Sequence, residues 1–196
     1  MRLSPICILA ALLTTGCSTT RPPEKSAVER FTTDTRRATV EGNTFIAPAG
    51  WTLTVRAPAT ILQPPEEDSR MVFVDVHAKD ADEAVASAWS AYGTHKNWPL
   101  KLKTESPDKE GWSDIHNYAY QTSPDERRGV QVMAHRAGGL WNVVIADVAD
   151  TTAEKRLAQF VLIFDELFPK GFTRESFAGK QANILDAPRV AELTLR

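Results

Sequence analysis

Ser106 and Lys109 have the Ser-x-x-Lys spacing that supports nucleophilic catalysis when one helical turn places the lysine amine beside the serine hydroxyl. The residues between them are Pro107 and Asp108, which favour a turn between strands. The sequence also has no Lys-Thr-Gly, Ser-Asp-Asn or Gly-x-Ser-x-Gly motif to complete a hydrolase site. We therefore interpret the spacing as chance and assign no catalytic residue.

Imidazoles are the next groups that could do chemistry, as metal ligands or as acids and bases. The chain has four, at His77, His95, His116 and His135. None forms a close-spaced ligand pair, so the sequence predicts no metal site and no cofactor. Asp75 and His77 share one face of a predicted strand, and Asp114 and His116 share one face of another. Two acid and imidazole patches that meet across a sheet and bind a cation or transfer protons stay an open alternative, but we favour isolated surface imidazoles.

Aromatic and charged residues give weaker signals. Five tryptophans occur, at Trp51, Trp89, Trp98, Trp112 and Trp141. They could line a ligand pocket, but large aromatic side chains in a domain of this kind more often form its core. The formal net charge is −2, from 23 Lys and Arg against 25 Asp and Glu, and this argues against nucleic acid as a partner. The charge runs 66–68 and 125–128 are interpreted as solvated loops.

The N-terminus has the pattern of a secretory signal. Met1-Arg2 is followed by an apolar run, Ile6 to Leu13, which is too short for a permanent membrane helix. Gly16-Cys17 then resembles the lipobox of bacterial lipoproteins, although Thr14 stands where that family usually has leucine. The resemblance implies cleavage before Cys17 and lipid attachment to its thiol.

The remaining cysteine and the following residues agree with that interpretation. Cys7 would be lost with the signal peptide, which leaves Cys17 as the only thiol of the mature chain. Two or three acyl chains hold a protein on a membrane more firmly than one chain does. Because Ser18 stands where an aspartate would resemble the inner-membrane retention signal, we expect the periplasmic face of the outer membrane.

Turn residues and apolar spacing predict the elements of the globular part. Extended runs cover seven segments: residues 44–46, 51–55, 71–77, 100–105, 112–121, 129–136 and 140–148. A strand-turn-strand is expected around Pro48 to Gly50, and a tight hairpin at Gly138-Gly139. Asp80 and Glu83 mark the start of a helix that ends near Gly93.

A second helix is predicted from about Asp150 to Phe168, with a packing stripe of Leu157, Phe160, Val161 and Phe164. Strands dominate and do not alternate regularly with helices. This order predicts an α+β fold with a largely antiparallel sheet flanked by two main helices. We divide the chain into a signal peptide at 1–16, a lipidated N-terminus and flexible tether at 17–38, the α+β domain at 39–172, and a linker with the start of a further helix at 173–196.

Two resemblances follow from these motifs. Pro48 to Trp51, with the order of elements over residues 39–168, is similar to PsbP-like α/β/α sandwich domains, which implies a non-catalytic binding or assembly module. Residues 175–180 and 185–193 resemble the N-terminal region of periplasmic serine hydrolases of the class C β-lactamase and penicillin-binding type. In that family a catalytic domain follows, with a first helix that starts at a position like Asp186.

The sequence therefore leaves two functions open. The first is a non-catalytic accessory domain of serine-hydrolase lineage, anchored by lipid, that binds or positions a partner such as a hydrolase domain. The second is an independent lipoprotein that binds a small apolar ligand or an envelope protein.

Overall fold

A computed structural model of the chain describes residues 27–93 and 98–174. Ten strands are present in these ranges: β1 (Val28–Arg30), β2 (Thr35–Ala38), β3 (Thr44–Ala47), β4 (Thr52–Arg56), β5 (Ala59–Gln63), β6 (Arg70–Val76), β7 (Leu100–Ser106), β8 (Ser113–Tyr120), β9 (Arg128–Ala137) and β10 (Leu140–Ala149). The helices are α1 (Ala81–Tyr92), the short 3-10 turn η1 (Pro124–Glu126) and α2 (Asp150–Asp165). This composition confirms the α+β prediction.

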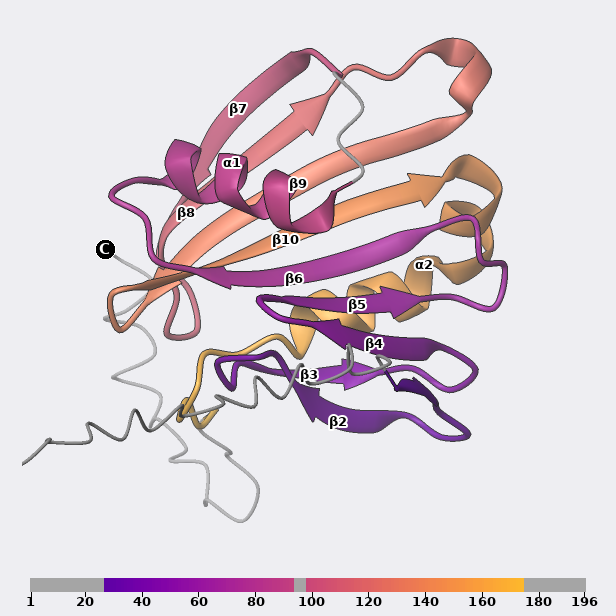
Figure 1. Cartoon of the computed structure of the whole chain (residues 1–196), viewed down its shortest axis with the longest axis horizontal. Coiled ribbons are helices and arrows are strands. Elements are labelled where there is room, and N and C mark those ends of the chain that lie inside the picture. The colour runs from indigo at the N-terminus through magenta and orange to yellow at the C-terminus, as the bar shows by residue number, and fades with distance from the viewer. Residues whose placement is uncertain (1–26, 94–97, 175–196) are drawn as a thin grey trace, which may run out of the picture.

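Eight of the strands form one antiparallel sheet in the order β1-β4-β5-β6-β10-β9-β8-β7, while β2 and β3 form a separate ribbon. The last four strands in that order form a meander, and its β9–β10 hairpin turns at Gly138-Gly139 as predicted. Both glycines have positive φ, +58° and +84°, which explains why glycine is needed there. The sheet is long enough to carry a helix on each face (Figure 1).

α1 forms as the sequence predicts. Asp80 caps it, because its carboxylate accepts the backbone N–H of Glu83 at 2.9 Å, and Gly93 ends it with φ +72°. The buried face of α1 consists of Ala81, Ala84, Val85, Ala88, Trp89 and Tyr92. This face packs on side chains from the middle of the sheet, including Val72, Val132 and Val143.

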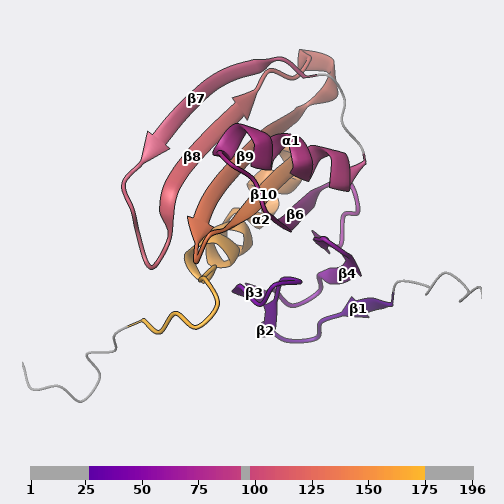
Figure 2. The same cartoon turned by 60° about the vertical axis from the view of Figure 1, so that its left-hand side comes forward.

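α2 lies on the opposite face of the sheet, behind it in Figure 1 and across β10 from α1 in Figure 2. Its N-cap is Ala149, and Asp150 is already its first helical residue, so the predicted side-chain cap is wrong. The predicted packing stripe is only partly correct. Phe160 and Ile163 are buried, but Leu157 is 63% exposed, Val161 48% and Phe164 36%.

The predicted boundary at residue 39 is wrong, because β1 and β2 lie inside the segment expected to be a flexible tether. Backbone pairing holds them: Glu29 lies opposite Leu53 of β4, and Arg36 lies opposite Ile46 of β3. Between these strands Phe31 is 4% exposed and joins the α2-side core. Because β1 and β2 carry charged side chains, the pattern of apolar residues did not predict them as strands.

The predicted strand-turn-strand around Pro48 to Gly50 is confirmed, because β3 and β4 lie on either side of this turn. The two strands do not pair with each other: β3 pairs with β2, and β4 pairs with β1 and β5. The sequence did not predict β5 at all.

Several predictions lie outside the described residues. They are the signal peptide at 1–16, the lipid attachment at Cys17, the position of His95, and the segment 175–196 with its helix from Asp186. Within residues 27–93 and 98–174, no helix is both long and apolar enough to cross a membrane.

Candidate functional site

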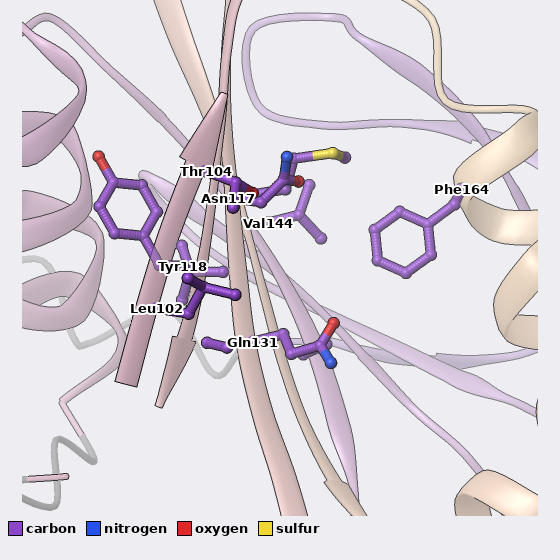
Figure 3. A pocket seen from close by; sticks show the side chains of 11 residues that line it. Leu102, Thr104, Asn117, Tyr118, Gln131, Val144 and Phe164 are labelled. Carbon is purple, nitrogen blue, oxygen red and sulfur yellow. The ribbon is translucent and has the colours of Figure 1, made fainter. Parts of the chain in front are cut away.

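The candidate site is an uncovered part of the α2 face, where four strands extend beyond the helix. Neighbouring strands align two rows of side chains on this face. One row is Leu102, Ala119, Gln131 and Ala146, and the other is Thr104, Asn117, Met133 and Val144. All eight residues line a cavity of about 290 Å³ whose other wall is Phe164 of α2. Figure 3 shows the Phe164 ring facing the strands across this space, with the Tyr118 ring on the far side of the strands.

Two further cavities continue the first along α2. One, of about 290 Å³, shares Gln131, Ala146 and Phe164 with it and extends to Leu157. The other, of about 270 Å³, shares Met133 and Phe164 and extends to Trp112. Together the three cavities form what we call the α2 groove, which is largely apolar and open to solvent.

The Trp112 end of the groove contains a buried imidazole. The rings of Trp112 and His135 are stacked, with centroids 3.8 Å apart, and the indole N–H of Trp112 donates to the carbonyl of Leu167 at 3.1 Å. His135 is only 1% exposed, yet it lines the cavity at this end. Burial lowers the pKa of the His135 imidazole to about 4, so the ring is neutral at pH 7.

A buried chain of hydrogen bonds runs from His135 across the sheet. Asn142 lies opposite His135 on one side and Asp75 on the other. The Asn142 amide nitrogen donates to Asp75 Oδ1 at 2.7 Å, which leaves its oxygen to accept His135 Nε2–H at 2.9 Å. Asn43 also donates to Asp75 Oδ1, at 2.8 Å, and the backbone N–H of Glu41 donates to Oδ2. The neutral ring therefore keeps its lone pair on Nδ1, a hydrogen-bond acceptor.

The predicted acid and imidazole patches do not meet. Asp75 is buried in the chain just described, whereas His77 lies past the end of β6 and is exposed. Asp114 has φ +50° at a register shift in β8 and pairs with Arg136 at 3.6 Å. His116 instead faces Glu105 at 3.7 Å. The prediction that each acid shares a strand face with its histidine assumed regular alternation of side chains. This alternation ends before His77, because β6 stops at Val76, and it is interrupted at Asp114 by the register shift in β8.

The other sequence candidates also have separate surroundings. Ser106 ends β7, and its hydroxyl accepts the side-chain amide of Asn117 at 2.9 Å, while the Lys109 ammonium lies 3.5 Å from Glu110. Glu66, interpreted as part of a solvated loop, pairs with Arg156 at 2.8 Å, and this hydrogen bond lowers the Glu66 pKa to about 2. In the described part of the chain, no three His, Cys, Asp or Glu residues come together as metal ligands.

The tryptophans are core residues, as predicted, because all five are at most 9% exposed. Trp112 is a core residue and also a pocket residue, since it is buried and lines the groove. Sequence reasoning missed the groove itself. Two signals could have indicated it: α2 has more apolar positions than one packing face needs, and β7 alternates Leu with Lys although it is an outer strand.

Comparison with known proteins supports the fold. No family model matches this sequence, and no curated protein does. The structure is similar to the solution structure of cyanobacterial PsbP (CyanoP) from Synechocystis sp. PCC 6803, with a TM-score of 0.51 and 11% sequence identity over 74% of this chain and 98% of that one. The chain thus has a PsbP-like fold, an antiparallel sheet flanked by two helices.

Proposed function

We propose that this chain is a non-catalytic lipoprotein module of the bacterial cell envelope whose α2 groove binds an apolar segment of a partner protein. One observation carries the proposal: apolar side chains that the fold does not need for its core line a continuous open groove. Monomeric proteins rarely leave a large connected apolar surface uncovered unless something binds there.

The shape of the groove favours a protein segment over one compact molecule. Each cavity, at 270–290 Å³, is at or below the lower limit of about 300 Å³ for small-molecule sites. The cavities follow one another along a helix, so successive side chains of a bound helix or strand can each occupy one. A small apolar ligand is the second candidate, favoured because the cavities join through Phe164.

The anchor and the lineage belong to the proposal too. Lipid attachment at Cys17 would hold the module at the periplasmic face of the outer membrane, as the lipobox-like residues suggest. The resemblance of residues 175–193 to serine-hydrolase N-terminal regions suggests a hydrolase domain as the partner. Intact-mass analysis of the membrane fraction tests the anchor, because it should show a chain that begins at Cys17 with added acyl mass, and Cys17→Ala should abolish that mass.

A matched pair of variants tests the groove. Leu102 is 56% exposed and lines it, while Leu100 on the same strand is 51% exposed and lines none of its three cavities. With N-phenyl-1-naphthylamine as a fluorescent apolar probe, we expect saturable binding to the full chain in mild detergent. Leu102→Ser should weaken this binding at least fivefold, and Leu100→Ser should leave it unchanged. Equal effects of both variants, or no saturable binding, would contradict a binding groove.

The non-catalytic part of the proposal has its own test. Among the described residues, neither Ser106 nor Lys109 has a partner that would activate the serine. We expect no turnover of a chromogenic cephalosporin above buffer and no covalent labelling by a fluorescent penicillin. Covalent labelling of Ser106 that is abolished by Lys109→Ala would overturn the proposal that the chain is non-catalytic.

A further inference from the structure

β7 is an unusual edge strand. It forms one end of the eight-stranded sheet, pairs with β8 alone among the strands of residues 27–93 and 98–174, and has all seven of its residues exposed. β1, at the other end, has only three residues. A long exposed edge is a template for another strand, and proteins usually shorten, charge or cover it.

Lys101 lies at a register shift near the start of β7, and the other two charges on this strand do not block its edge, because they have contacts within the fold. The Lys103 ammonium lies 2.7 Å from Asp82 of α1 and over the Tyr118 ring, and Glu105 faces His116. Both side chains are therefore drawn toward the α1 face. Leu102 and Thr104 lie on the other face, where they line the groove.

The regularly paired part of β7 has a sequence that can pair favourably with the same segment of a second copy. A register shift separates Leu100 from Leu102, so Leu102 to Ser106 is the segment with uninterrupted pairing. In an antiparallel pair of two such segments centred on Thr104, each Lys103 lies opposite Glu105 of the other copy, and each Leu102 lies opposite Ser106. Opposite charges directly across an antiparallel ladder, and paired threonine hydroxyls at its centre, are favourable.

We propose that β7 binds β7 of a second copy of this chain in this register, with the two-fold axis at Thr104. Because a residue lies opposite its own copy on the axis, the α2 faces of both sheets point to the same side. The two α2 grooves then adjoin across the axis, with Leu102 and Thr104 of both copies between them. The pairing rests on β7 alone and not on the proposed binding function, so each can fail separately.

Charge reversal tests the pairing. The full chain with Cys7→Ser and Cys17→Ser, in mild detergent, should show a concentration-dependent monomer–dimer equilibrium by sedimentation. Lys103→Glu and Glu105→Lys should each weaken the dimer at least tenfold, because like charges then face each other. An equimolar mixture of the two variants should restore association, since in the mixed pair positions 103 and 105 of the two copies again carry opposite charges.

A cross-link tests the register without relying on charge. Thr104→Cys in the same background should form an intermolecular disulfide under mild oxidation, because residues on the axis are directly opposed. Leu100→Cys should not. A monomer at every concentration, a dimer indifferent to charge reversal, or equal cross-linking at both positions would overturn the proposal, and so would association only with an unrelated partner strand.

Discussion

The two faces of the sheet are covered to different extents, although the longer helix covers the more open face. α1 buries six of its 12 residues, whereas α2 buries three of its 16. α1 lies over the middle of the sheet and packs with buried side chains of β5, β6, β8, β9 and β10. α2 lies nearer to β3 and β10, which leaves β7 and much of β8 and β9 uncovered on its side, although Ile115 and His135 are buried there (Figures 1 and 2).

This difference separates two uses of apolar residues. On the α1 face nearly every apolar side chain is part of the core. On the α2 face Leu102, Leu157 and Phe164 contribute little to the core and instead line a groove. The closed face should therefore control stability, and the open face should control binding.

The largest effect should come from the closed face. Trp89 is 4% exposed, packs against the rings of Tyr92 and Trp98, and donates its indole N–H to the Tyr120 hydroxyl at 3.0 Å. Trp89→Ala should lower the free energy of unfolding by about 3–5 kcal/mol, as large-to-small changes at buried aromatic residues do. Urea unfolding measures this, and a loss below about 1 kcal/mol would mean that this face is not closed.

A buried aromatic residue of α2 should also contribute strongly to stability. Phe160 is 8% exposed, and its ring meets Trp51 edge to face at 5.2 Å. Phe160→Ala should cost about 3 kcal/mol, the lower end of the range for buried aromatics, since the face is partly open. The same denaturant titration measures it. An effect no larger than that of Leu157→Ala would show that α2 does not dock through Phe160.

The buried imidazole predicts a pH dependence. Below pH 6.5 the unfolded chain protonates His135, but the folded chain does not until the pH nears 4, so stability falls as the pH falls through this window. Between pH 6.5 and 5 the loss should be about 2 kcal/mol. His135→Gln keeps a donor for Asn142 and does not titrate. The free energy of unfolding of this variant should therefore fall less between pH 6.5 and 5, by that amount. Parallel curves of unfolding free energy against pH for the two proteins would contradict the burial of His135.

The smallest effect on stability should come from the groove. Leu157 lines its far end and is 63% exposed. Leu157→Ala should change the free energy of unfolding by less than about 0.5 kcal/mol, as most surface substitutions do. A change above about 2 kcal/mol would show that this side chain belongs to the core and would weaken the contrast between the two faces.

Local signals made part of the fold predictable. The cap at Asp80, the spacing of apolar residues in α1 and the Gly138-Gly139 turn each act within a few residues, so the sequence alone indicates them. β1 and β2 carry no such signal. They are ordered by backbone pairing with β4 and β3, which depends on the rest of the fold.

The candidate site was beyond local reasoning for a related physical reason. The strand pattern groups Asp75 with His77, but the donor to Asp75 from the neighbouring strand is Asn142, and the register of β6, β10 and β9 links Asp75 through Asn142 to His135. The groove likewise depends on where α2 crosses the sheet. The helical spacing predicts an apolar stripe, yet it does not say which part of that stripe the sheet covers.

The chain's methionines provide the most direct test of the contrast between the two kinds of surface. Met133 lines the groove, and Met71 is fully buried in the α2-side core. With methyl-¹³C methionine in the full chain, titration with N-phenyl-1-naphthylamine should shift the Met133 methyl resonance progressively and leave that of Met71 unchanged. A shift of Met71 as large as that of Met133, or no shift of Met133 at probe saturation, would contradict the account.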